Sequence, residues 1–295
     1  MRPVKILTDS CSDMSRDLRE KYDIDYARMK TVYDGKEQWA SLDFEYYTPK
    51  QLYDIMREGN RILTTQVPPD EFTRIFTEYL DKGFDIVYIG CSLKQSGSVN
   101  TGAVVARTLL ESRPDANIFC MDSMNACIGE GILAIKGACY RDQGLSAKEI
   151  FDKLVTERKT INEYVTVHSL DSLKRAGRVK ASAAFFGNLL GVKPILIADA
   201  KGDQVAVKKV KGRLNSFHEI VNMLKESITD AENQTIYLCH ADCEKEEVDS
   251  LAQMVREEIP CKDVHISYIG PIIGASIGPD AIGIWATGKE VTFEG

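Results

Sequence analysis

The stretch Asp85-Ile-Val-Tyr-Ile-Gly-Cys-Ser-Leu-Lys-Gln-Ser-Gly-Ser-Val-Asn-Thr101 indicates the fold class of the chain. Residues 86–89 form an unbroken apolar run of strand length, which is typical of a strand buried in a parallel sheet. A loop rich in serine and glycine follows, and apolar residues then recur at helical spacing from residue 103 to residue 110. This order of strand, small polar loop and helix predicts a unit of an α/β fold.

The same loop has the composition of an anion-binding site. A helix start presents backbone N–H groups that have no partner within the helix, and the helix dipole adds partial positive charge there. Ser96 and Ser98 offer hydroxyl donors, and Gly97 lets the backbone approach a bound oxyanion closely. Serine and glycine also occur at such junctions simply as turn and cap residues, so the loop by itself leaves both interpretations open.

The composition limits the classes of protein to which the chain belongs. Its 295 residues are enough for two domains, and its 44% hydrophobic and 27% charged residues are those of an ordinary soluble protein. The net charge of -7, without any basic run, argues against nucleic-acid binding. No apolar stretch approaches the ~18 residues of a membrane helix, and the N-terminus lacks an apolar signal segment, so we expect a cytoplasmic protein.

The eight cysteines are scattered and no Cys-x-x-Cys occurs, so we interpret them as reduced core residues. Cys239, His240 and Cys243 form the densest group of potential metal ligands. They lack a second ligand pair at zinc spacing. We therefore interpret this group as structural and expect no metal site and no cofactor.

Strand and helix signals alternate up to about residue 160, which predicts a doubly wound α/β domain over residues 1–160. The pattern then changes, and residues 161–295 predict a mixed α/β domain with a hairpin around residues 200–203. Asp34-Gly35 predicts another hairpin turn. Thr48 with Gln51, and Ser146 with Glu149, have the spacing of capping boxes at helix starts.

Polar residues follow several predicted strands, where α/β sheets bind ligands. Asp9 and Ser10 follow the first strand, Asp122 follows a later one, and the hydroxyls of Thr64 and Thr65 precede a stiff double proline. Asp9 can equally cap the next helix. No P-loop and no Gly-x-Ser-x-Gly elbow occurs. A hydrolase or phosphotransferase using Asp9, Ser10 or Asp122 stays an alternative.

Six short motifs, taken together, resemble the bacterial DegV family. They are Thr8-Asp9-Ser10, Thr64-Thr65-Gln66-Val67-Pro68, Gln95-Ser96-Gly97-Ser98, Asp122-Ser123 with Gly129-x-Gly131, Lys174-Arg-Ala-Gly-Arg-Val179, and Gly270-Pro-Ile-Ile-Gly-Ala-Ser-Ile-Gly-Pro279. Each motif is weak alone, but all six occur in the family's order and span nearly the whole chain. The family includes the fatty-acid-binding subunits of fatty acid kinase.

The resemblance implies a two-domain fold, with an N-terminal three-layer α/β/α domain on a parallel sheet and a C-terminal two-layer α/β domain with a mixed sheet. It implies one long-chain fatty acid buried between the domains, with its carboxylate held by the hydroxyls that match Thr64 and Ser96. We expect Thr65 and Gly97 to lie at the carboxylate as well, with Ser276 in support. The resemblance further implies a carrier without catalytic residues, which presents the acid to a separate ATP-binding kinase subunit for acyl-phosphate formation. Membrane contact would be transient at most.

The sequence departs from the family pattern at two places. Ser276 stands where the family usually has a histidine, so a carrier of a different amphipathic anion is a further alternative. Lys211-Gly212-Arg213 stands where Arg-Thr is common, so Lys211 or Arg213 would supply basic charge for phosphoryl transfer. Arg178, in the basic turn, is a candidate contact for the partner, with a helix-end role as the alternative.

Overall fold

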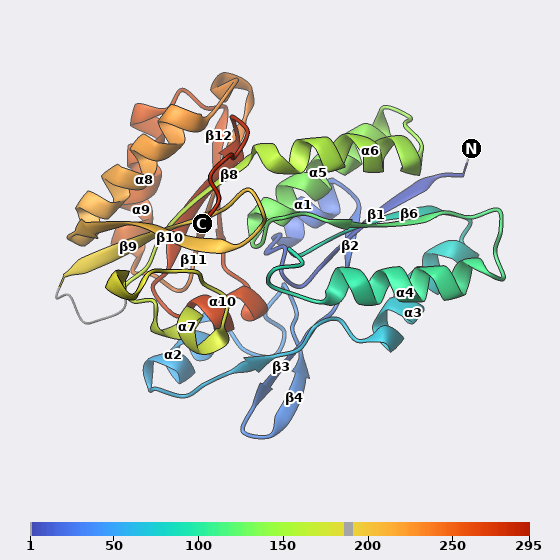
Figure 1. Cartoon of the computed structure of the whole chain (residues 1–295), viewed down its shortest axis with the longest axis horizontal. Coiled ribbons are helices and arrows are strands. Elements are labelled where there is room, and N and C mark those ends of the chain that lie inside the picture. The colour runs from blue at the N-terminus through green and yellow to red at the C-terminus, as the bar shows by residue number, and fades with distance from the viewer. Residues whose placement is uncertain (1, 186–190) are drawn as a thin grey trace. The chain divides into compact units, whose positions relative to one another are not determined.

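The computed structural model describes residues 2–185 and 191–295, and its helices and strands form two units (Figure 1). The first unit comprises the chain up to Tyr46, Ile62–Arg158 and Gly270–Ile272. The second comprises Tyr47–Arg61, Lys159–Ile269 and Ile273–Gly295. The sequence-based division into 1–160 and 161–295 treats the chain as two continuous pieces, whereas here residues 47–61 pack with the second unit.

A parallel four-stranded sheet forms the centre of the first unit, in the order β2-β1-β6-β7. The strands are β1 (Val4–Asp9), β2 (Ile24–Ala27), β6 (Asp85–Gly90) and β7 (Ile118–Asp122). Strand β6 is buried along its whole length, as the apolar run 86–89 predicts. All four strands therefore end at the same edge of the sheet, where the predicted polar loops begin.

Helices cover both faces of this sheet. Figure 1 shows α5 and α6 above it and α3 and α4 below it. The helices of this unit are α1 (Arg16–Lys21), α3 (Pro69–Asp81), α4 (Ser98–Leu110), α5 (Ile128–Asp142) and α6 (Ala147–Glu157). Helix α4 buries Val99, Gly102 and Val105 at helical spacing. The predicted three-layer α/β/α arrangement is thus confirmed.

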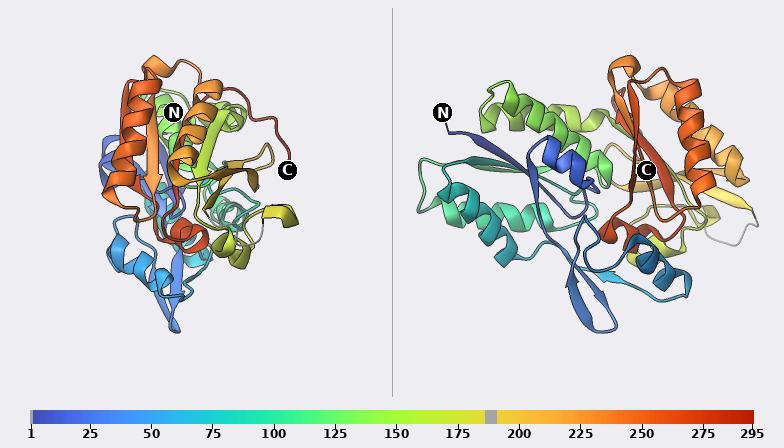
Figure 2. Two further views of the ribbon diagram at one scale, coloured as in Figure 1. Left: turned by 90° about the vertical axis from the view of Figure 1, so that its left-hand side faces the viewer. Right: turned by 180° about the vertical axis from the view of Figure 1, so that it is seen from behind.

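A small antiparallel sheet of order β4-β3-β5 also belongs to the first unit. Its strands are β3 (Lys30–Tyr33), β4 (Lys36–Trp39) and β5 (Leu63–Thr64). Asp34 and Gly35 both have positive φ, 50° and 71°, so the predicted hairpin turn is confirmed. The hairpin extends away from the four-stranded sheet (Figure 2, right). Strand β5, which no sequence pattern indicated, places Thr64 on the edge of β3.

The second unit contains a mixed six-stranded sheet of order β10-β9-β8-β13-β11-β12. Its strands are β8 (Ile161–Thr166), β9 (Val192–Ala198), β10 (Gln204–Lys211), β11 (Thr235–His240), β12 (Asp263–Tyr268) and β13 (Ile282–Thr287). β11 and β12 pair in parallel and the other neighbours are antiparallel. The predicted mixed sheet and the predicted β9–β10 hairpin are both confirmed.

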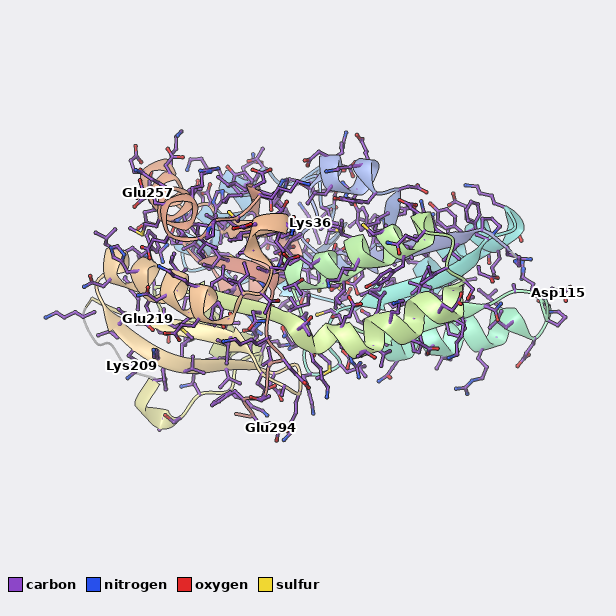
Figure 3. All side chains as sticks on the ribbon, turned by 90° about the horizontal axis from the view of Figure 1, so that it is seen from above. Lys36, Asp115, Lys209, Glu219, Glu257 and Glu294 are labelled. Carbon is purple, nitrogen blue, oxygen red and sulfur yellow. The ribbon has the colours of Figure 1, made fainter. Side chains whose placement is uncertain are left out.

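Two long helices, α8 (Arg213–Ser227) and α9 (Lys245–Glu258), pack on one face of this sheet and share one apolar core with it. Figure 3 views the molecule from above and marks α8 by Glu219 and α9 by Glu257. The unit also contains α2 (Pro49–Arg57) and α7 (Asp171–Ala176), and α10 (Pro271–Ile277) continues into it. Both predicted capping boxes, at Thr48 and Ser146, are present.

The apolar, glycine-rich run 269–285 folds into helix α10 and strand β13, which its composition alone did not indicate. Glycine is needed there because another side chain packs against the backbone. A Cβ on Gly274 would overlap the hydroxyl of the fully buried Tyr53 in α2. The Tyr53 hydroxyl donates to the Ile269 carbonyl oxygen at 2.6 Å, so α2 holds the segment that leads into α10.

Candidate functional site

The loop after β5 and the loop after β6 lie side by side, which joins the two sequence motifs that contain Thr64 and Ser96. The Val67 N–H donates to Ser98 Oγ at 3.1 Å. The Gln66 side-chain amide donates to Thr101 Oγ1 at 2.9 Å. Both bonds tie the segment that follows Thr64 to the first turns of α4. The hydroxyl loops that the sequence singled out separately therefore form one surface of the first unit.

Ser96 lies at the centre of this surface and is half-buried. Its Oγ lies 3.0 Å from Ser98 Oγ and accepts the Ser98 N–H at 3.3 Å. Helix α4 begins two residues later, at Ser98, so the loop leads into the helix end whose first-turn N–H groups lack helical acceptors. Hydroxyl and amide donors thus gather at the start of α4, as an oxyanion site requires.

Gly97 is the N-cap residue of α4 and has a φ of -83°, which any residue adopts. Its lack of a side chain matters for another reason, because a Cβ there would overlap the Gln66 amide oxygen. The sequence suggested that glycine at this position admits an oxyanion. In the structure the close neighbour is Gln66, which lies across the glycine and reaches Thr101.

The two threonines of the β5 loop differ in how their hydroxyls are used. The Thr65 hydroxyl accepts the Lys30 N–H at 3.3 Å and donates to the Gln66 carbonyl oxygen at 3.0 Å, so it fixes the loop. Thr64 is half-buried, and no residue of the described ranges bonds to its hydroxyl. Of the two, Thr64 retains a donor for a ligand.

Asp122 supports the loop that carries Ser96. Its Oδ1 accepts the Leu93 N–H at 3.2 Å and the Met124 N–H at 2.9 Å. The Asn125 carbonyl oxygen accepts the Ser92 N–H at 2.8 Å in the same turn. These bonds connect the end of β7 to the start of the Ser96 loop. These hydrogen bonds give Asp122 a structural role as an anchor of the loop, so its position needs no catalytic explanation.

Asp9 and Ser10 are completely buried. Asp9 accepts hydrogen bonds from the Tyr88 hydroxyl at 2.7 Å and from the N–H groups of Cys91 and Cys11. Ser10 accepts the Met29 N–H and donates to a backbone carbonyl oxygen. The N-cap residue of α1 is Ser15, so Asp9 does not cap that helix. Both side chains fix loops of the first unit, which disfavours a hydrolase built on them.

Two buried carboxyl groups next to Asp9 carried no sequence signal. Glu130 Oε1 accepts the Thr8 hydroxyl and the Asp9 N–H, and burial together with the neighbouring Asp9 raises the pKa of Glu130 well above its usual range. Asp13 is 3% exposed, and its carboxyl group faces the Cys127 thiol and the Gly270 N–H. Burial raises the pKa of Asp13 to about 8. The motif Gly129-x-Gly131 flanks Glu130 and was the nearest hint.

Ser276 belongs to the part of α10 that lies in the second unit, and it is half-buried. The packing of Tyr53 against Gly274 sets the position of this helix within that unit.

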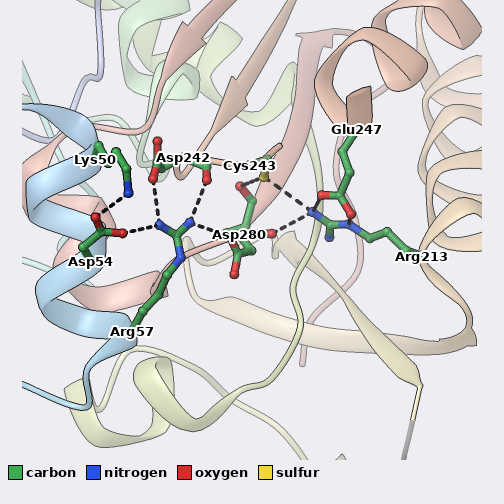
Figure 4. Close-up of polar contacts among 9 residues, drawn as sticks. Lys50, Asp54, Arg57, Arg213, Asp242, Cys243, Glu247 and Asp280 are labelled. Atoms are coloured by element: carbon green, nitrogen blue, oxygen red, sulfur yellow. Dashed lines mark hydrogen bonds and ion pairs between the residues drawn. The ribbon is translucent and has the colours of Figure 1, made fainter. Parts of the chain in front are cut away.

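Of the three predicted basic contacts, Arg213 is engaged inside the second unit. Figure 4 shows its guanidinium against Glu247, with N–O distances of 2.9 and 3.2 Å, and against the Asp280 carbonyl oxygen at 2.7 Å. Its side chain is only 13% exposed. Arg178 and Lys211 are both exposed. Arg178 also donates to the Ala176 carbonyl oxygen at 2.6 Å, so it contacts the end of α7 as the helix-end alternative expects.

A second guanidinium organises the same region (Figure 4). Arg57 of α2 pairs with Asp54 at 3.0 Å, Asp242 at 2.7 Å and Asp280 at 2.6 Å. Asp242 and Asp280 have positive φ, 55° and 62°, a left-handed conformation that aspartate adopts more readily than most residues. Arg57 thereby anchors the segment that the N-terminal half contributes to the second unit.

Cys239 and Cys243 are buried and bond to Ser267 Oγ and to the Ala281 carbonyl oxygen, as structural residues do. Burial lowers the pKa of His240 to about 4. No group of three or more potential ligand side chains stands ready for a metal ion in residues 2–185 and 191–295. In the same described residues, no helix combines the length and the apolar character needed to span a membrane.

Comparison with known proteins places these features in a family. The family model described as "Uncharacterised protein, DegV family" matches residues 3–289. A DegV domain-containing protein of Clostridium perfringens is 35% identical over 288 residues, covering 98% of both chains. A second such protein of that organism is 31% identical over 285 residues, covering 95% of this chain and 97% of its own.

Solved structures agree with the fold. A fatty-acid-binding DegV family protein from Thermus thermophilus has a TM-score of 0.87 at 24% identity, covering 98% of this chain and 100% of its own. DegV of Bacillus subtilis, described as a fatty acid binding protein, has a TM-score of 0.81 at 25% identity with the same coverage. With the family model matching almost end to end and relatives above 30% identity, the chain belongs to the DegV family.

Proposed function

We propose that this protein binds one long-chain fatty acid and holds its carboxylate at the start of α4, with Thr64 and Ser96 as hydroxyl donors and backbone N–H groups near Gly97. The observation that carries the proposal is the pair of hydrogen bonds that ties the loop after Thr64 to the Ser96 loop. The similarity to the B. subtilis fatty acid binding protein, at 25% identity over 98% of this chain, supports the same ligand class.

The chemistry of the donors fits a carboxylate. An ionised carboxylate only accepts hydrogen bonds, and a buried one without donors costs several kcal/mol. Hydroxyls and helix N-terminal N–H groups meet this need without a neighbouring cation. An acyl chain of ~14 methylenes, at ~0.8 kcal/mol each, gains on the order of 11 kcal/mol before association costs. Such a ligand binds tightly once its head group is satisfied.

We assign supporting roles to Thr65 and Ser276. The Thr65 hydroxyl is committed to its own loop, so its contribution is to hold Thr64 in place. Ser276 replaces the histidine usual in the family. Because a serine hydroxyl reaches less far than an imidazole, we propose that it contacts the carboxylate through water. The expectation that the acyl chain lies between the two domains stays a prediction, as does the cytoplasmic location.

We further propose that the protein is a carrier and that a separate ATP-binding kinase subunit phosphorylates the bound acid. Arg178 and Lys211 are the exposed basic candidates for contact with that partner, whereas Arg213 is engaged with Glu247. Arg178→Ala should lower the rate of acyl-phosphate formation by the reconstituted pair, and the neighbouring Arg175→Ala is the matched control. Equal rates for both variants would remove Arg178 from the contact.

The test of fatty-acid binding is native mass spectrometry of the purified protein, followed by organic extraction and identification of the released compound. We expect a mass excess of one fatty acid per chain, and its loss in Thr64→Ala combined with Ser96→Ala. Thr108→Ala, an exposed position on α4, is the control. Unchanged occupancy in the double variant would show that the carboxylate lies elsewhere. An extracted compound of another class would support the alternative of a different amphipathic anion.

A further inference from the structure

Ser98 is the residue through which the two loops of the site meet. It is completely buried, at the first position of α4. Its Oγ accepts the Val67 N–H at 3.1 Å and lies 3.0 Å from Ser96 Oγ. Its backbone N–H donates to Ser96 Oγ at 3.3 Å. The hydroxyl of Ser98 therefore stands between a fixed amide donor and the hydroxyl that we assign to the ligand.

The direction of the bond between the two hydroxyls follows from counting protons. Each hydroxyl has one proton to donate. Within the described residues, Ser96 Oγ is the acceptor available to the Ser98 hydroxyl. If Ser96 donated instead, the Ser98 proton would be buried without an acceptor, which is unfavourable. Ser98 is therefore the donor and Ser96 the acceptor.

The consequence for Ser96 is that its oxygen is occupied and its proton is free. Ser96 Oγ accepts both the Ser98 hydroxyl and the Ser98 N–H. Its own proton must therefore point away from Ser98, and Ser96 is itself only half-buried. Because hydrogen bonds in such a chain polarise one another, the sequence from Val67 N–H through Ser98 to Ser96 strengthens the final donor.

We infer that Ser98 is a positioning residue that makes Ser96 an obligate hydrogen-bond donor, so that Ser96 favours head groups that only accept, such as an ionised carboxylate, over head groups that must also donate. This inference rests on the proposed fatty-acid site. A fatty alcohol of the same chain length accepts the Ser96 proton as well. Its own proton finds no acceptor on Ser96, because both acceptor positions are filled.

The experiment compares the dissociation constants of palmitate and of hexadecanol for the full-length chain by calorimetry. The variants are Ser98→Ala, Ser96→Ala, the double variant and the conservative Ser98→Thr, with Thr108→Ala as the control on the same helix. Thermal unfolding of each variant reports on folding. Ser98→Ala also leaves the Val67 N–H without its acceptor, whereas Ser98→Thr keeps a hydroxyl for both bonds, so the ligand preference and the Ser96→Ala background are the readouts that separate the orientation of Ser96 from an altered loop.

We expect Ser98→Ala to weaken palmitate binding about tenfold, the value of roughly one oriented hydrogen bond to a charged group, and to reduce the preference for palmitate over hexadecanol. Ser98→Thr should restore both. In the Ser96→Ala background, Ser98→Ala should change palmitate affinity less than about twofold, because Ser98 acts through Ser96. A merely structural residue would weaken both ligands equally and add to the effect of Ser96→Ala.

Three results would overturn the inference, and the third also overturns the proposed function. Additive losses in the double variant, or an unchanged preference between the two ligands in Ser98→Ala, would show that Ser98 does not orient Ser96 while fatty-acid binding stands. If the wild-type chain takes up no palmitate at all, the proposed function fails, and the role of Ser98 falls with it.

Discussion

Asp13 provides a test of how a buried carboxyl group makes the stability of the first unit depend on pH. The side chain of this residue is almost fully buried. Burial raises the pKa of Asp13 to about 8, while the Cys127 thiol and the Gly270 N–H oppose the shift and Asp9 adds to it. The change to make is Asp13→Asn, which keeps the shape and removes the titrating group.

The sign and size of the effect follow from the pKa values of the two states. In the unfolded chain an aspartate has a pKa of about 3.9. Between that value and about 8, the folded protein keeps the proton of Asp13 and the unfolded chain releases it. The contribution of Asp13 to stability is therefore fully present below the pKa that this residue has in the unfolded chain. It is lost as pH rises through the pKa that it has in the folded protein. The free energy of unfolding falls by at most ~1.4 kcal/mol per pH unit because of this group, or by ~2.7 kcal/mol between pH 5 and pH 7.

The assay is urea unfolding of the wild type and of Asp13→Asn at pH 5, 6, 7 and 8. Other buried carboxyls, such as Glu130, affect both proteins and cancel in the difference. We expect the variant to gain free energy of unfolding relative to the wild type as pH rises across this range. Asp115→Asn, at an exposed turn, is the matched control. A difference between the two proteins that stays constant from pH 5 to pH 8 would refute the reasoning.

Three further substitutions test the packing described above. Gly97→Ala should push the Gln66 amide off Thr101 and weaken fatty-acid binding about fivefold in calorimetry, the loss of roughly 1 kcal/mol of hydrogen bonding; Gln66→Ala removes the same bond, so the two changes combined should cost no more than either alone, and additive losses would contradict the assigned overlap. Arg57→Ala should lower the free energy of unfolding in urea by about 1 kcal/mol, because it removes the ion pairs to the partly exposed Asp242 and Asp280; an unchanged midpoint would show that the network is not stabilising. Gly274→Ala should cost about 1–3 kcal/mol in thermal unfolding by overpacking against Tyr53, and a wild-type melting temperature would disprove that contact.

Local signals predicted local structure correctly. The Asp34-Gly35 turn and the capping box at Thr48 require nothing beyond neighbouring residues, because the turn depends on two φ angles and the cap on hydrogen bonds across one helical turn. The buried strand β6 was equally clear from its apolar run. Strand β5 was not, because two residues carry no periodicity and their pairing partner β3 lies about thirty residues away.

The sequence predicted the motifs of the candidate site but not how they connect. The motifs containing Thr64 and Ser96 stood out by composition, and the family resemblance assigned them a role. Their connection through Val67 and Ser98 was not predictable, since a hydrogen bond between segments about thirty residues apart leaves no trace in either segment. The burial of Asp9 was not predictable either, because the same carboxylate after a strand suits an exposed site, a cap or an internal anchor.

The sequence by itself determined the two-part α/β organisation, the membership of the family and the residue types at the proposed ligand surface, because periodicity, capping and turn chemistry act over short spans of chain. Only the tertiary structure decided which groups are desolvated and which donors remain free. It buried Asp13 and Glu130, committed the hydroxyl of Thr65 and the guanidinium of Arg213, and directed Ser98 at Ser96. Burial and hydrogen-bond partners depend on what distant segments pack against a side chain, and that is settled only when the chain folds.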